Sequence, residues 1–156
     1  MERVRESMKI LMDRCKEEDL SVWIRPEIGG KTTSFGSLEE LLQLSVEFDN
    51  VLPCIDWAHL HARSLGKNNS SKEFAAIVEA VEKVLGKEAL KNVHCHVEGI
   101  EIGSTGERFH KNLKETDYRY PDLMKAFRDF GCKGVIISES PNIEEDALLM
   151  QKAYLK

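Results

Sequence analysis

Several carboxylates and imidazoles stand directly after short runs of apolar residues, and these are the residues most able to do chemistry. They are Glu27, Asp56, His96 and Glu139, with His59 three residues after Asp56. Mixed carboxylate and imidazole ligands suit zinc, manganese or iron, and one carboxylate often bridges two such ions. Paired ions about 3.5–4 Å apart can activate water and stabilise the leaving oxygen of a phosphoester. The sequence therefore predicts a site for divalent metal ions.

The elements that must position these residues alternate along the chain. A helix over 3–18 precedes four predicted strands, each followed by a helical pattern; the strands are 20–27, 51–56, 92–98 and 135–139. This alternation predicts an α/β fold with parallel strands and right-handed crossovers. Strand ends that carry metal-capable residues are typical of the active-site face of a (β/α) barrel. Four units are too few to close eight strands, so residues 1–156 are expected to form one half-barrel domain or an open sheet.

The segments between the strands carry further signals. Ser37 and Glu40 predict a capping box at the start of the second helix. Residues 57–69 are expected to be a polar loop with at most a short helical turn, in which His61 is exposed. Residues 99–117 are expected to be a long polar loop that contains His110. A loop of that length inside a compact domain usually has a function.

Composition excludes several classes of protein. The formal net charge of −5 offers no bulk electrostatic attraction for nucleic acid, so any DNA contact needs a local basic patch. The 4 cysteines form no C-x-x-C pair, which argues against a disulfide framework or a zinc ribbon and favours reduced thiols in a cytoplasmic protein. The absence of a signal peptide or long apolar run predicts no membrane association.

Each candidate also has a purely structural interpretation. Glu27 could face solvent, and His94 and His96 could be core histidines on one strand face. Arg25 and Lys31 could bind a substrate phosphate or stay solvated. Trp57 could stack on a substrate base or pack beneath the loop, and packing is favoured. The prediction of a metal site rests on the agreement of several strand ends rather than on any one residue.

Five segments together resemble the endonuclease IV family, within the xylose isomerase-like TIM barrels. They are R-P-E-I-G-G (25–30), C-I-D-W-A-H (54–59), V-H-C-H-V-E-G (93–99), E-R-F-H (107–110) and I-S-E-S-P-N (137–142). They occur in the family's order and span nearly the whole chain. The resemblance covers the carboxyl-terminal half of the family's (β/α)8 barrel, and it implies that fold.

The resemblance also implies an activity and a set of ligands. The family's enzymes cleave DNA on the 5′ side of an abasic site with three zinc-type ions. Glu27 then resembles the carboxylate that bridges two ions, with Asp56, His96 and Glu139 as further ligands; His59 and His110 belong to the third ion. Glu27 and Glu139 would also orient the attacking water. The expected cofactor is zinc, with manganese as the alternative, and the expected partner is DNA with abasic sites.

Two departures from the family's pattern bear on this expectation. Arg108 stands where the family has an aspartate two residues before the loop histidine, so the third ion's site is incomplete or differently filled. The two histidines that the family takes from its amino-terminal half have no counterpart here. The chain is therefore expected to be a fragment or a shortened form of a longer barrel. Its open edges predict association, as a homodimer or with a partner half-barrel.

Two other functions stay open from the sequence. A sugar isomerase or epimerase on the same type of barrel would need one divalent ion, for which Glu27, Asp56, His96 and Glu139 suffice. An inactive half-barrel that serves as an assembly module would need no working site. Metal stoichiometry distinguishes them, because one ion per chain favours the isomerase and two or more favour phosphoester cleavage.

Overall fold

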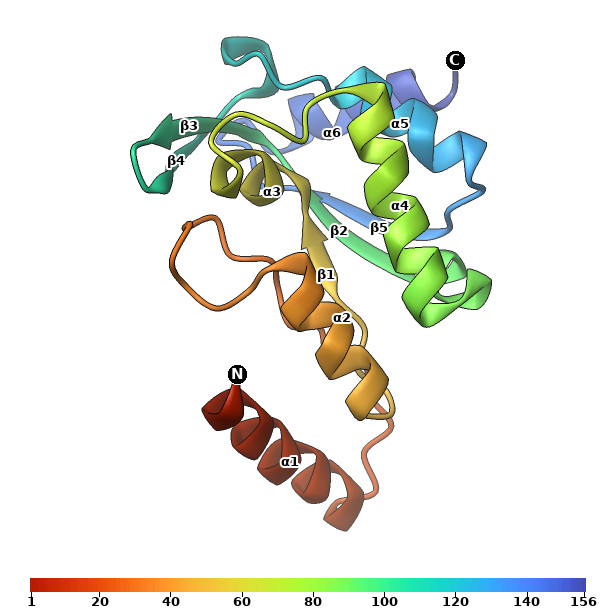
Figure 1. Ribbon diagram of the computed structural model, residues 1–156. Coiled ribbons are helices and arrows are strands. Elements are labelled where there is room, and N and C mark those ends of the chain that lie inside the picture. Colours follow the sequence, from red (N-terminus) through yellow and green to blue (C-terminus); the bar gives the residue numbers. More distant parts are fainter.

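The computed structural model describes residues 1–156 and contains a three-stranded parallel sheet with helices packed on one face (Figure 1). The sheet has the order β1 (Cys54–Asp56), β2 (Val93–Val97), β5 (Gly134–Ser138). Because all three strands are parallel, their carboxyl ends lie at the same edge. This confirms the predicted α/β fold with parallel strands.

Local sequence explains where the helices start and stop. They are α1 (Glu2–Glu17), α2 (Leu38–Glu47), α3 (Trp57–Arg63), α4 (Ser71–Leu85), α5 (Tyr120–Asp129) and α6 (Glu144–Tyr154). The predicted capping box is present, since the Ser37 side chain accepts from the Glu40 N–H and the Glu40 carboxylate accepts from the Ser37 N–H. Pro121 in the first turn of α5 needs no amide partner, so it is well suited to a helix start.

The segment predicted as the first strand pairs less than expected. Residues 20–27 run alongside β1 but form only two isolated parallel bridges, Ile24 to Val51 and Glu27 to Cys54. Pro26 lies between the two bridges and has no N–H to donate, which interrupts a regular ladder. Even so, the bridge at Glu27 fixes its position next to the sheet.

Two predicted loops are regular structure instead. Residues 99–111 form an antiparallel hairpin of β3 (Gly99–Gly103) and β4 (Gly106–Lys111), followed by the short 3-10 helix η2 (Leu113–Glu115). The segment after β1 is the helix α3, because Asp56 caps it by accepting from the His59 N–H at 2.7 Å. His61 is therefore not exposed as predicted, but buried with its Nδ1 2.7 Å from the Lys67 carbonyl oxygen.

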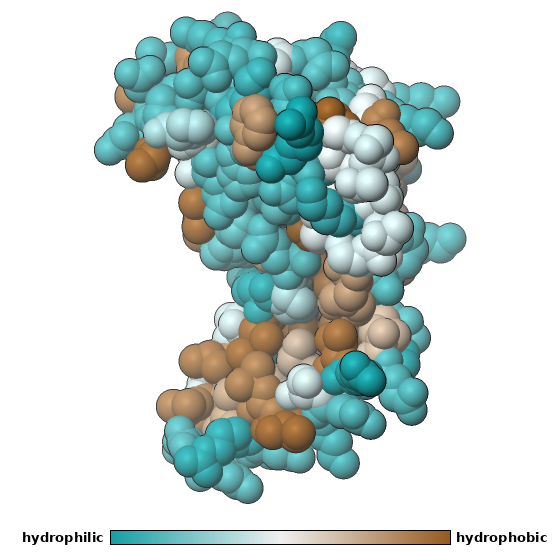
Figure 2. Space-filling model, turned by 90° about the vertical axis from the view of Figure 1, so that its left-hand side faces the viewer, coloured by the Kyte–Doolittle hydropathy of each residue, from teal (hydrophilic) through white to brown (hydrophobic).

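The core lies between the sheet and the helices. Side chains that alternate along the strands point to opposite faces. Ile55 and Cys95 point to the helices and are buried, whereas the other face of β5 leaves Val135 50% and Ile137 39% exposed. Seen from the side that is at the left in Figure 1, hydrophobic residues gather on the lower part of the surface, where α1 and α2 lie (Figure 2). No helix is long and apolar enough to cross a membrane.

Candidate metal centre

The strand register brings the predicted ligands to one edge of the sheet. Asp56 at the end of β1 pairs with His96 of β2, and Glu139 follows directly after β5. The bridge between Glu27 and Cys54 places Glu27 beside the same edge. Four residues that are far apart in the sequence are thus neighbours because the parallel strands end together.

These residues form a first cluster of ligand atoms. Glu27, Asp56, His96 and Glu139 each offer one atom, and the four atoms lie within 4.8 Å of one another. His96 is at the centre, with its Nδ1 3.1 Å from Glu27 Oε1 and 3.3 Å from Glu139 Oε1. Three carboxylates around one imidazole repel one another unless a cation lies among them. This arrangement suits a divalent ion.

A second cluster consists of His59, Glu107 and His110, whose ligand atoms also lie within 4.8 Å of one another. The Nδ1 atoms of both histidines face carbonyl oxygens, His59 at 2.8 Å from Ile28 and His110 at 3.2 Å from Glu139. A carbonyl oxygen only accepts, so each Nδ1 carries the proton and each Nε2 offers a lone pair. The Nε2 atoms lie 3.3 Å and 3.8 Å from the Glu107 carboxylate oxygens. Hydrogen bonds of this kind orient histidines that bind metals.

Glu107 is a ligand candidate that sequence reasoning missed, and a β-bulge explains its position. In a regular strand, residues three apart point to opposite faces, so Glu107 and His110 would diverge. The hairpin pairs Glu101 with Phe109 but Ile102 with Glu107, so Arg108 is the extra residue of a bulge. The bulge turns Glu107 to the face of His110. Glu107 thus places a carboxylate in the second cluster, from the position next to Arg108.

The loop that precedes α2 approaches this cluster closely at Gly30. A Cβ atom added there would lie 2.5 Å from Glu107 Oε2 and 3.0 Å from His59 Cδ2. The Gly30 carbonyl also accepts from the Glu107 N–H at 3.0 Å, which holds the loop against the hairpin. Glycine is required here because any side chain would displace the Glu107 carboxylate.

Buried polar atoms without partners support metal binding at these clusters. Asp56 and Glu98 are both 0% exposed, and His59 Nε2, Asp56 Oδ2 and both Glu98 carboxylate oxygens accept from no N–H group or hydroxyl. A proton held by Glu98 can be shared only with the Asp56 carboxylate. Burial, followed by the charge of Asp56, raises the pKa of Glu98 to about 11, and burial likewise raises the pKa of Asp56. An unpaired buried carboxylate is costly. The ligand atoms of Asp56, His59 and Glu98 lie within 4.8 Å of one another, so the residues present fit a cation.

The remaining predicted site residues lie in different surroundings. Lys31 is near the centre and donates to the Glu107 carbonyl oxygen. Arg25 instead donates to Asn92 Oδ1 at 2.7 Å, next to the start of β2, so its guanidinium is engaged away from the carboxyl edge. Trp57 is 1% exposed and packs edge-on against Phe74 and Phe127, so stacking on a substrate base was the wrong interpretation and packing the right one.

The second cluster leads to a direct prediction. Glu107→Gln is expected to remove one bound ion per chain, because the neutral amide is a much weaker ligand than the carboxylate. Arg108→Ala is the matched control, since its side chain lies outside the cluster, and it should keep all ions. Elemental analysis of the zinc-loaded proteins measures both. Loss of an ion from Arg108→Ala, with none lost from Glu107→Gln, would contradict the assignment.

Comparison with known proteins shows which sequences and structures this chain resembles. The family model described as xylose isomerase-like TIM barrel matches residues 1–155. A Methanocaldococcus jannaschii protein described as "Uncharacterized protein MJ0133" is 46% identical over 152 residues, covering 97% of this chain and 55% of that protein. The chain therefore spans about half the length of the curated relative that it matches. A solved structure described as "The crystal structure of AsfvAP:AG" is similar with TM-score 0.55 and 16% identity, over 86% of this chain and 54% of that one.

Proposed function

The chain belongs to the xylose isomerase-like TIM barrel family, and from that premise we propose that it is a metal-dependent phosphodiesterase acting on DNA at abasic sites. Its parallel strands and helices form part of that barrel fold. The substrate class comes from the endonuclease IV motifs around Glu27, Asp56, His96, His110 and Glu139. The ion is proposed to be zinc, because the ligands combine imidazoles with carboxylates.

One observation carries the proposal: Glu139 links the two ligand clusters. Its carboxylate Oε1 lies 3.3 Å from His96 Nδ1 in the first cluster, and its backbone carbonyl accepts from His110 Nδ1 at 3.2 Å in the second. Two adjacent clusters could hold two ions. Two adjacent ions are the arrangement that phosphoester hydrolysis uses, whereas carbonyl polarisation needs only one.

The residues of the chain can then be given roles. Zinc-type ions, when bound, supply Lewis acidity to the phosphate and to the leaving oxygen. Glu27 and Glu139 are 40% and 33% exposed, so both reach the open side of the centre. There either carboxylate can orient a water molecule and accept its proton while the water oxygen bonds to phosphorus. The bond from phosphorus to the 3′ oxygen breaks, and that oxygen leaves as an alkoxide that takes a proton from solvent to become the 3′ hydroxyl. An abasic nucleotide would have to rotate out of the duplex to reach the strand ends.

The isomerase interpretation has one observation in its favour. The first cluster alone provides three carboxylates and one imidazole, which is enough for a single ion. That interpretation gives no role to the second cluster, whose two imidazoles are already oriented by carbonyl groups. An assembly module without activity would need neither cluster. Two ordered clusters therefore support phosphoester cleavage over both alternatives.

The experiment is a cleavage assay on the zinc-loaded protein. A duplex with a single abasic site analogue should be cut on its 5′ side, and the same duplex without that site should stay intact. Manganese loading is the second arm. Elemental analysis run in parallel should give two or more ions per chain. Full metal loading without cleavage would exclude the proposed activity for this chain, and a single ion per chain would favour the isomerase.

We further propose that a second copy of the chain completes the barrel. The outer edge of β5 has no strand partner, and residues 22–27 have none on the side away from β1. The adjoining inner face exposes Val135 and Ile137, and Val22 and Trp23 are 45% and 51% exposed at the other edge. A two-fold axis along the barrel would place β5 of each copy beside residues 22–27 of the other. All strands would then stay parallel, and both edges would be covered.

Light scattering at micromolar concentration tests this arrangement. The chain is expected to be a dimer, and the double substitution Val135→Lys and Ile137→Lys should make it a monomer by placing charges in the seam. Leu155→Lys, at a residue that is 76% exposed near the end of the chain, should leave the dimer intact. A monodisperse monomer of the unsubstituted chain would contradict the proposal.

A further inference from the structure

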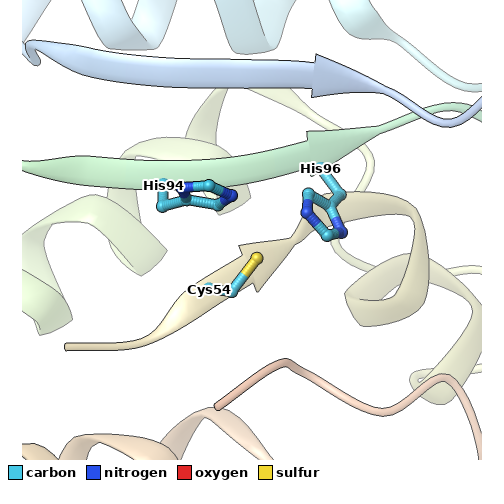
Figure 3. Close-up of side chains that lie close together, drawn as sticks. All are labelled: Cys54, His94 and His96. Carbon is cyan, nitrogen blue, oxygen red and sulfur yellow. The ribbon is translucent and has the colours of Figure 1, made fainter. Parts of the chain in front are cut away.

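A third group of metal-capable side chains lies on the inner face of the sheet, next to the carboxylates on the side of the amino ends of the strands. It consists of Cys54, His94 and His96, whose ligand atoms lie within 4.8 Å of one another. None of the interpretations above gives Cys54 or His94 a role. The Cys54 sulfur points toward the space between the two imidazole rings (Figure 3).

The strand register explains why these three side chains meet. Cys54 of β1 pairs with His94 of β2, and the next pair on the same face is Asp56 with His96. Residues two apart on a strand point to the same face, so the four side chains form a small square on the inner face. The two imidazole rings are 5.6 Å apart between centroids and inclined by 64°, with the edge of one ring toward the other.

The donors are free to bind an ion. Cys54 is an unpaired thiol that is 3% exposed, and neither its sulfur nor the His94 ring makes a hydrogen bond. Burial and the nearby Glu27 carboxylate raise the pKa of the Cys54 thiol, so it keeps its proton until an ion binds. Cys95, the next residue after His94, points to the helices on the other face and is 0% exposed. It therefore cannot join the group, although its thiol is close in sequence.

We propose that Cys54, His94 and His96 form an additional site for a thiophilic zinc-type ion. One sulfur and two nitrogens favour zinc or copper over magnesium or manganese, and they leave one position of a tetrahedron open. Binding replaces the thiol proton with a sulfur–metal bond and releases that proton to solvent. Because His96 also belongs to the carboxylate cluster, the two sites are adjacent and occupation of one affects the other.

Cobalt(II) titration of the full chain tests the site, since cobalt replaces zinc and absorbs in the near ultraviolet when a thiolate binds it. The band is expected in the unsubstituted chain and in Cys95→Ala. This variant is the matched control, because it removes a thiol from β2 that points to the other face of the sheet. Cys54→Ala should lose the band together with one ion per chain. His94→Gln, at a partly exposed residue, should weaken cobalt binding at this site about tenfold or more and serves if Cys54→Ala does not fold.

The outcomes separate this site from the proposed activity. Cobalt binding without the thiolate band, or a band that persists in Cys54→Ala, would overturn the site whatever the cleavage assay shows. A band lost in Cys54→Ala but unchanged in strength and affinity in His94→Gln would overturn the three-residue assignment. The readout is the spectrum and the ion count, so a chain that does not cleave DNA can still confirm it.

Discussion

Glu139→Gln is expected to lower kcat/KM for cleavage of the abasic duplex by about 10³-fold or more. The substitution keeps the shape of the side chain but removes its charge and one ligand oxygen. The variant loses a charged ligand of the first cluster, where Glu139 Oε1 lies 3.3 Å from His96 Nδ1. It also loses one of the two carboxylates placed to accept the proton from water.

The measurement is a steady-state cleavage assay on the zinc-loaded variant, with elemental analysis of the same sample. Glu144→Gln is the matched control, because this exposed residue at the start of α6 makes the same chemical change outside the site. It should cleave as the unsubstituted chain does. If Glu139→Gln kept its activity and its ions, Glu139 would have neither role.

The sequence predicted the first ligand cluster because parallel strands impose a simple rule. Residues that end neighbouring strands must meet at one edge, whatever their distance along the chain. Asp56, His96 and Glu139 obey that rule and lie together, and the isolated bridge adds Glu27 even though its strand is irregular. The sequence pattern was sufficient for this cluster because the backbone geometry of parallel strands alone decides which residues meet at the edge.

The alternation of residues along β2 predicts the position of Glu98. His94, His96 and Glu98 alternate along β2 and past its end, so they are expected on one face. Glu98 is fully buried beside Asp56 and His59. The segment V-H-C-H-V-E-G was identified as a motif, and the alternation within it was enough to place this carboxylate at the centre.

Glu107 could not be found in that way. Its spacing of three from His110 predicts opposite faces in a regular strand, and the antiparallel partner that creates the bulge at Arg108 was itself expected to be a loop. A bulge depends on cross-strand pairing, which no local pattern reveals. The same limit applies to His61, whose burial follows from the packing of α3 rather than from its own neighbours in sequence.

The stability of the metal-free chain should fall as pH rises, and bound zinc should offset this fall. When a chelator has removed all metal, burial and the charge of Asp56 hold the pKa of Glu98 at about 11, above its ordinary value of 4.5. Above about pH 4.5 the unfolded chain loses this proton while the folded chain keeps it, so the free energy of unfolding falls as pH rises. The slope is at most about 1.4 kcal/mol per pH unit for one group. A bound cation replaces the proton, so zinc should stabilise the chain more at pH 8 than at pH 5.5.

Urea unfolding at these two pH values, with chelator and with zinc, measures the effect. Glu98→Gln should reduce the pH dependence of the metal-free chain, because the amide stays neutral in both states while the raised pKa of Asp56 still contributes. Glu88→Gln, at an exposed residue, should leave that dependence unchanged. If Glu98→Gln and the unsubstituted chain showed the same pH dependence without metal, Glu98 would have the same pKa in the folded and the unfolded chain. Its carboxyl group would then not be held protonated by burial, and the proton that zinc is expected to replace would be absent.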